Sequence, residues 1–152
     1  MDHTTTPRPT ETPLRPAMIL FVEDDSSVRA LVTRLLTLHK YRVFSAEHGP
    51  AALPLWEQHR DEIELLLTDV VMPPGMNGHE LAAHCQSQSP RLKVIFTSGY
   101  NMELSAPDGW LREGLNFLQK PYRPEQLLEV IRAVLAGSPN VENKTYAASS
   151  SR

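Results

Sequence analysis

Acidic, hydroxyl and lysine side chains stand at four separate points of the sequence, each directly after a short apolar segment. The four groups are Glu23-Asp24-Asp25, Thr68-Asp69, Thr97-Ser98-Gly99 and Gln119-Lys120-Pro121. Carboxylates that crowd together repel one another, so a cluster of them favours a neutralising cation. Mg²⁺ is bound in proteins by oxygen ligands, commonly one or two carboxylates together with several waters. We therefore expect a Mg²⁺ site wherever the fold brings these acids together.

The lysine adds a second positive charge to this chemistry. We expect Lys120 to pair with Asp69 or with an anion bound beside it. A carboxylate between a metal ion and an ammonium group is well placed to attack phosphorus, because both cations neutralise charge on the transferred phosphoryl oxygens. The product would be an aspartyl phosphate at Asp69, to which the Thr97 hydroxyl could donate a hydrogen bond.

The apolar segments before these groups have the length and pattern of buried strands. Five such segments cover residues 18–22, 41–46, 63–67, 92–96 and 115–118. Three of them, MILFV, IELLL and LKVIF, are apolar at nearly consecutive positions. This pattern is typical of a parallel sheet that is covered on both faces.

Helical patterns separate the predicted strands. After Ser26 or Ser27, either of which could cap a helix, apolar residues at helical spacing predict one buried stripe, made of Val28, Leu31, Val32, Leu35 and Leu36. Further helices are expected over 50–59, 78–87, 102–113 and 124–136. Internal proline predicts a late start or a kink in the helix over 50–59, and a short or broken helix over 102–113.

The alternation of strands and helices predicts an α/β domain with a doubly wound parallel sheet and helices on both faces. In such folds, functional groups gather at the carboxyl ends of the strands. If the strand order is 2-1-3-4-5, the four strands that end in acids, hydroxyl and lysine are neighbours. Their ends then converge on one shallow cleft.

Composition limits the classes of protein to which the chain can belong. Within its 152 residues we expect one domain at 17–136, a flexible Pro/Thr-rich leader at 1–16 and a polar tail at 137–152. A single cysteine, Cys85, excludes an internal disulfide and favours the cytoplasm. A net charge of −3 without a cluster of basic residues argues against direct binding of nucleic acid. No apolar run is long enough to span a bilayer.

Four segments in this order, ILFVEDD, LLLTDVVMPPGMNG, VIFTSG and FLQKP, resemble the response-regulator receiver domain of two-component signalling. The resemblance covers 17–136 and implies a flavodoxin-like, five-stranded fold. By their places in the motifs, Asp69 matches the phosphoacceptor and Asp24 the direct metal ligand. Glu23 matches the acid that acts through a metal-bound water, and the main-chain carbonyl of Val71 matches the third protein ligand of the metal.

The resemblance also implies a switch. Thr97 matches the switch hydroxyl, and Lys120 matches the lysine that pairs with the phosphoryl group. In the family the bond that corresponds to Lys120–Pro121 is cis. Phe117 matches the aromatic residue that turns inward when the hydroxyl moves toward the phosphoryl group. Phosphorylation would thereby change the surface formed by the fourth helix, the fifth strand and the fifth helix.

The sequence departs from the family pattern at two places. The segment MPPGMNG has one residue more than the common M-P-x-M-x-G form, which predicts a reshaped loop after Asp69. Val71 and Gly99 occupy positions that in the family influence the water that hydrolyses the phosphoryl group. Neither side chain can hydrogen-bond water, so we predict that hydrolysis is not assisted by these side chains.

The function implied is that of a phosphoacceptor, which takes a phosphoryl group from a histidine kinase or phosphotransfer protein and acts on a downstream protein target. Such a module is not an enzyme in the usual sense, although it accelerates its own phosphorylation and dephosphorylation. We interpret the chain as a stand-alone receiver or as part of a hybrid histidine kinase, because the tail is too short to fold as a DNA-binding module.

Two alternatives belong to other classes. One is a receiver-like scaffold for protein interactions that is not phosphorylated, against which the intact acid, hydroxyl and lysine set argues. The other is an aspartate-based phosphohydrolase. That class needs an acid two residues after the nucleophile, where this chain has Val71.

Overall fold

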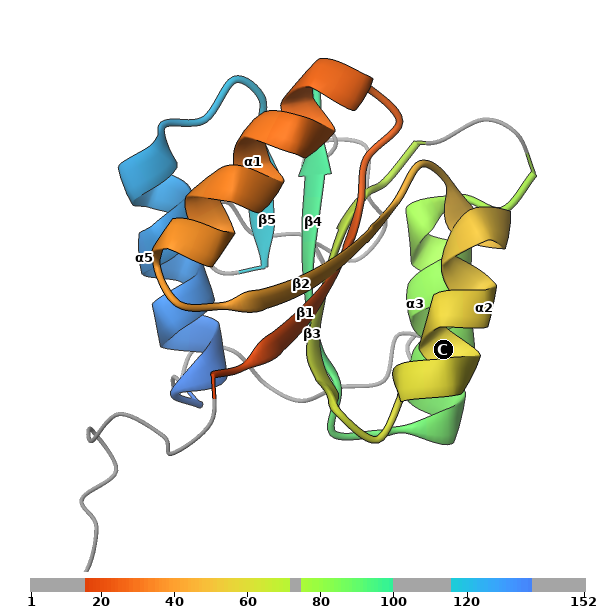
Figure 1. Ribbon diagram of the computed structural model, residues 1–152. Helices are drawn as coiled ribbons and strands as arrows, with labels where there is room; N and C mark the ends of the chain where they lie inside the picture. Colours follow the sequence, from red (N-terminus) through yellow and green to blue (C-terminus); the bar gives the residue numbers. More distant parts are fainter. Residues whose placement is uncertain (1–15, 72–74, 100–115, 138–152) are drawn as a thin grey trace, which may run out of the picture.

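The computed structural model describes residues 16–71, 75–99 and 116–137 (Figure 1). Strands and helices alternate along them: β1 (Met18–Val22), α1 (Ser26–Leu38), β2 (Arg42–Ala46), α2 (Gly49–His59), β3 (Ile63–Asp69), α3 (Gly78–Gln88), β4 (Lys93–Ser98), β5 (Phe117–Gln119) and α5 (Pro124–Leu135). The predicted helix over 102–113 lies outside the described residues. So do the predicted leader and tail, apart from Pro16 and Gly137 at their borders.

The five strands form one parallel sheet in the order β2-β1-β3-β4-β5. This arrangement confirms the predicted fold class and strand order. The central strand β3 is buried at every position except Glu64, as expected of a strand that is covered on both faces. Because all strands run in the same direction, their carboxyl ends lie along one edge of the sheet.

Helices cover both faces of the sheet, with α1 and α5 on one side and α2 and α3 on the other (Figure 1). Successive strand residues point to opposite faces, so each face has its own core. Leu66 and Phe96 belong to the core under α2 and α3, whereas Leu67 and Ile95 belong to the core under α1 and α5. Complete burial of a side chain of this size stabilises the fold by about 1.5–3 kcal/mol.

The first turn of α1 differs from the prediction. Asp25 caps the helix, in place of Ser26 or Ser27, because its Oδ1 accepts hydrogen bonds from the backbone N–H groups of Ser27 (2.9 Å) and Val28 (3.0 Å). An ionised carboxylate at this position also interacts favourably with the positive end of the helix dipole. The acid that seemed to belong to a carboxylate cluster therefore has a local structural role.

The buried stripe of α1 is narrower than predicted. Val32 and Leu36 are buried, and Val28 and Leu35 are partly buried, but the side chain of Leu31 is 69% exposed. Adjacent helical residues point about 100° apart. A seam centred on Val32 and Leu36 therefore leaves Leu31 at its edge, facing solvent.

Helix α2 begins at Gly49, so the late start predicted from Pro54 is wrong. His48 caps the helix, since its Nδ1 accepts a hydrogen bond from the N–H of Ala51 (3.0 Å). Pro50 lies in the first turn, where its missing N–H has no intrahelical acceptor in any case. The cap and the first turn are thus satisfied, and Pro54 is accommodated inside the helix.

Strands β3 and β4 each continue two residues beyond the predicted apolar segments. The added residues are polar but buried, and Asp69 of β3 pairs with Thr97 of β4 in the parallel ladder. The candidate site residues Asp69 and Thr97 are therefore part of the paired strands and do not lie in the loops that follow them. Among the described residues, no helix has the length and apolar character needed to cross a membrane.

Candidate functional site

Four neighbouring strands deliver the predicted site residues to one edge of the sheet. Asp69 is the last residue of β3 and Thr97 the second-last residue of β4, while Glu23 directly follows β1 and Lys120 directly follows β5. The backbone N–H of Lys120 donates to the carbonyl of Ser98 (2.8 Å), which ties the end of β5 to that of β4. The strand order thus brings together residues separated by up to 97 positions in the sequence.

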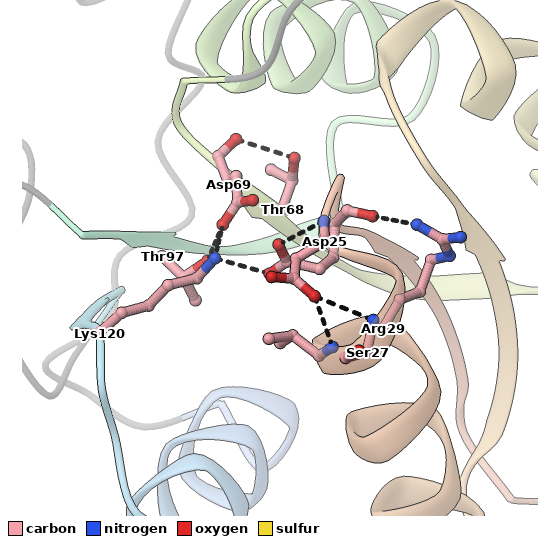
Figure 2. Close-up of polar contacts among 9 residues, drawn as sticks. Asp25, Ser27, Arg29, Thr68, Asp69, Thr97 and Lys120 are labelled. Atoms are coloured by element: carbon pink, nitrogen blue, oxygen red, sulfur yellow. Dashed lines mark hydrogen bonds and ion pairs between the residues drawn. The ribbon is translucent and has the colours of Figure 1, made fainter.

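Asp69 is held by two donors from different strands. Its Oδ1 accepts a hydrogen bond from the Thr97 hydroxyl at 2.6 Å and lies 2.9 Å from Lys120 Nζ (Figure 2). The carboxylate of Asp69 is almost completely buried. A short hydrogen bond and an ammonium group on the same oxygen fix its direction before any ligand is bound.

Lys120 makes a second ion pair, which the sequence did not predict. Its Nζ lies 2.7 Å from Glu23 Oε1, so the ammonium group bridges Glu23 and Asp69. Glu23 is only 1% exposed, and a buried carboxylate needs such a partner. The lysine therefore neutralises part of the acidic cluster in the described structure.

Burial and charge shift the protonation of this cluster. Burial raises the pKa of Glu23 from 4.5 to about 7, although the hydrogen bond from Lys120 opposes the shift. For Lys120, burial by itself lowers the pKa, but the hydrogen bonds to Glu23 and Asp69 outweigh it and the net pKa is raised. The lysine is therefore a permanent cation at neutral pH.

The carboxylates of Glu23, Asp24 and Asp69 lie close to one another. Each offers an oxygen, and these three oxygens all lie within 4.8 Å of one another. Hard divalent cations such as Mg²⁺ take oxygen ligands of this kind, so the donor set fits such an ion. Asp24 is exposed, which leaves solvent access to the cluster. The side chain of Val71, whose carbonyl the resemblance implies as a further ligand, is 50% exposed.

The turn between β1 and α1 positions two of these acids. Glu23 Oε2 accepts a hydrogen bond from the N–H of Asp25 at 3.1 Å, and the Arg29 guanidinium donates to the Glu23 carbonyl at 2.7 Å (Figure 2). Sequence reasoning singled out neither contact. The contact of Arg29 did have a signal in the sequence. A basic residue lies in the first turn of a helix that directly follows acidic residues at a strand end.

Gly78 lets the start of α3 approach Asp69 from behind. Its N–H donates to the Val70 carbonyl at 2.7 Å, and a Cβ at this position would overlap the main-chain carbonyl oxygen of Asp69. A capping box between Asn77 and Glu80 fixes the helix start at this place. The sequence marked Gly78 as the start of a helix but not as a contact with the site.

Two further predicted features lie on or next to β5, namely Phe117 and the Lys120–Pro121 bond. Phe117 is completely buried and packs in the core under α2 and α3. The peptide bond between Lys120 and Pro121 is cis, the geometry that the resemblance implies. The hydroxyl of Tyr122, which follows, is buried and has no hydrogen-bond partner among the described residues.

Known proteins resemble the chain over the same region. A family model described as "Response regulator receiver domain" matches residues 19–132. The response regulator receiver protein CpdR of Brucella abortus is 33% identical over 118 residues, which cover 77% of this chain and 95% of that protein. The sensor kinase CckA of Brucella abortus is 34% identical over 119 residues, which cover 78% of this chain.

Some of these relatives are much longer proteins. The matched region spans 12% of CckA and 26% of the response regulator protein FleR of Pseudomonas aeruginosa. It therefore corresponds to one part of each of these two proteins.

Solved structures show the same fold. The receiver domain from the hybrid histidine kinase CckA superimposes with a TM-score of 0.65 at 34% identity, covering 78% of this chain and 99% of that one. The Vibrio cholerae chemotaxis protein CheY4 gives a TM-score of 0.67 at 26% identity, covering 78% and 98%. Motifs, strand order and relatives agree, and the chain belongs to the family of response regulator receiver domains of two-component systems.

Proposed function

We propose that the chain accepts a phosphoryl group on Asp69, from a histidine kinase or a phosphotransfer protein, with Mg²⁺ bound beside it. The observation that carries the proposal is the arrangement around the Asp69 carboxylate. One of its oxygens is held by Thr97 and Lys120, and the oxygens of Glu23 and Asp24 lie close by. A nucleophile, a cation site and an ammonium group are thus supplied by four strand ends.

Asp69 acts as the nucleophile in the proposed reaction. Its carboxylate oxygen forms a bond to phosphorus, while the bond between phosphorus and the donor imidazole nitrogen breaks and its electron pair stays with the imidazole. Glu23 and Asp24 would hold Mg²⁺, together with Asp69 and the carbonyl of Val71. When bound, the ion supplies positive charge that stabilises the transferring phosphoryl oxygens.

Lys120 must change partner during this step. In the described structure its ammonium group neutralises Glu23 and Asp69. With Mg²⁺ bound by the same carboxylates, the Lys120 ammonium group would be free to pair with the phosphoryl group. The Thr97 hydroxyl, already 2.6 Å from Asp69 Oδ1, donates to the phosphoryl group in the same way.

We further propose that this rearrangement is transmitted to a downstream protein target. Thr97 and Phe117 lie on adjacent strands, in which Thr97 pairs with Leu118 and Phe96 with Phe117. A movement of Thr97 that also shifts its backbone would therefore reach the strand that carries Phe117. Two populated arrangements of this pair would differ in the surface beside β5 and α5.

The proposed function is tested by intact mass after incubation with a small-molecule phosphodonor and Mg²⁺. We expect one phosphoryl group on the wild type and on Asp25→Asn, and none on Asp69→Asn or after chelation of the metal. Asp25→Asn is the matched control, because it makes the same change at a neighbouring acid and asparagine still caps α1. If the wild type binds Mg²⁺ but gains no phosphoryl group, the proposal fails and the scaffold alternative is favoured.

A further inference from the structure

The turn after β1 directs the side chains of two consecutive acidic residues toward the same point. Consecutive residues of a strand point to opposite faces of the sheet. Glu23 and Asp24 are consecutive, yet each places a carboxylate oxygen within 4.8 Å of the other and of Asp69. The backbone must therefore leave the strand conformation at this point and be held there.

Arg29 contacts this part of the backbone directly. Its Nη1 donates to the main-chain carbonyl of Glu23 at 2.7 Å, and the guanidinium is partly buried against the turn (Figure 2). A hydrogen bond from a charged donor at this distance is among the stronger ones in proteins. It acts on the carbonyl that joins Glu23 to Asp24, so it constrains the direction of both acids.

The helix in turn fixes Arg29. The backbone N–H of Arg29 donates to the Asp25 carbonyl at 2.8 Å, as the first helical hydrogen bond of α1. The Asp25 side chain caps the same turn through Ser27 and Val28. The start of α1 and the acid pair are thus connected by short contacts within seven residues of sequence, from Glu23 to Arg29.

We infer that Arg29 is a positioning residue for the metal site, which holds the Glu23–Asp24 peptide so that both carboxylates face Asp69. This inference rests on the proposed function, because it assumes that the three carboxylates bind Mg²⁺. Arg29 acts through the backbone of the acids and contacts none of their carboxylates in the described structure.

The sign of the effect separates this role from a purely electrostatic one. A guanidinium close to a cation site repels Mg²⁺, so removal of its charge alone would tighten binding. Loss of the hydrogen bond to the Glu23 carbonyl would instead loosen the acid pair and weaken binding. The two explanations predict opposite changes in the dissociation constant for Mg²⁺.

The experiment is a calorimetric titration with Mg²⁺ of the wild type, Arg29→Met and Arg34→Met. Arg34 lies on the same helix, is exposed and makes no contact with the turn among the described residues, so its substitution removes the same charge without the contact. We expect the dissociation constant to rise about tenfold in Arg29→Met, the effect of losing one hydrogen bond to a charged group. Arg34→Met should leave it unchanged.

A second measurement separates positioning from general loss of structure. The thermal unfolding midpoint of each variant is measured without Mg²⁺ and with saturating Mg²⁺. We expect Arg29→Met to unfold cooperatively and to require a higher Mg²⁺ concentration for the same stabilisation. If Arg29→Met does not fold, the Mg²⁺ affinity of Arg29→Lys tests the inference instead. Lysine keeps the positive charge but has a shorter side chain, so this variant should bind Mg²⁺ with intermediate affinity.

Unchanged or tighter Mg²⁺ binding by Arg29→Met would overturn the inference and leave the proposed function intact. If Arg29→Met does not fold, wild-type affinity for Mg²⁺ in Arg29→Lys would also overturn the inference. A wild type that binds no Mg²⁺ would overturn the inference together with the proposed function. The results for the wild type and for Arg29 therefore distinguish the two failures.

Discussion

Gly78→Ala should disturb the backbone directly behind the proposed phosphoacceptor. A Cβ on residue 78 would overlap the carbonyl oxygen of Asp69, and would lie 2.9 Å from the carbonyl carbon and 3.1 Å from Val70 Cα. All three are backbone atoms of Asp69 and Val70, so rotation of a side chain cannot relieve the overlap. The start of α3 must move outward instead, which also breaks the hydrogen bond from the Gly78 N–H to the Val70 carbonyl.

The magnitude follows from these two contributions. Overpacking a closed site costs about 1–3 kcal/mol, and loss of a backbone hydrogen bond costs about 0.5–1.5 kcal/mol. The free energy of unfolding should therefore fall by about 1.5–4.5 kcal/mol. For a domain of this size, 1 kcal/mol shifts the thermal unfolding midpoint by roughly 4 °C, so we expect the midpoint to fall by about 6–18 °C.

The assay is thermal and urea unfolding of Gly78→Ala beside Gly99→Ala. Gly99 also follows a strand end at the site, but a Cβ there meets no atom of the described residues within 4 Å, so this control should unfold like the wild type. A midpoint for Gly78→Ala within about 2 °C of the wild type would refute the steric argument, since a loss of even 1 kcal/mol should lower the midpoint by roughly 4 °C. A large loss in Gly99→Ala would refute it as well.

Three further predictions concern single groups near the site. Because burial raises the pKa of Glu23 from 4.5 to about 7, the folded protein binds a proton that the unfolded chain has released. In urea unfolding without Mg²⁺, the free energy of unfolding should therefore fall by up to about 3 kcal/mol from pH 4.5 to pH 7. Glu23→Gln should flatten this pH dependence, and an equally steep pH dependence in the variant would contradict the raised pKa of Glu23. Tyr122→Phe removes a buried hydroxyl that has no partner among the described residues, so unfolding free energy should rise by about 1 kcal/mol, and a clear loss would show a missed contact. Val71→Ala should leave the decay rate of the phosphorylated form unchanged, measured by mass over time, because its half-exposed side chain cannot bond water; a sharp slowing would contradict this.

The sequence predicted the parallel sheet because buried parallel strands have a distinct pattern, whereas the strand order came with the resemblance to receiver domains. MILFV, IELLL and LKVIF are apolar on both faces, which few other structures require. Their ends were predicted less well. Asp69 and Thr97 are polar and therefore looked like residues beyond the strands, whereas pairing between β3 and β4 keeps them in the ladder.

Caps and exposures were harder to predict, since they depend on local geometry. Asp25 and His48 cap their helices because the backbone enters each helix at an angle that points these side chains at free N–H groups. The sequence offered Ser26 and Ser27 as equally suitable caps. The exposure of Leu31 depends on how α1 is rotated against the sheet, which periodicity alone does not determine.

Part of the candidate site followed from the motifs, and part required the structure. The meeting of Asp69, Thr97 and Lys120 was expected from the strand order and is found. The bridge from Lys120 to Glu23 was not expected, because it depends on the length of the lysine side chain and the burial of Glu23. The roles of these residues in phosphorylation remain predictions.

The central claim is that Asp69 itself carries the phosphoryl group. The most direct measurement is to phosphorylate the wild type with a small-molecule phosphodonor and Mg²⁺, reduce the acyl phosphate with borohydride, and sequence the peptides by mass spectrometry. Reduction converts a phosphorylated aspartate into homoserine. We expect homoserine at position 69 and aspartate at positions 24 and 25. Homoserine at another position, or phosphate on a histidine with position 69 unchanged, would contradict it.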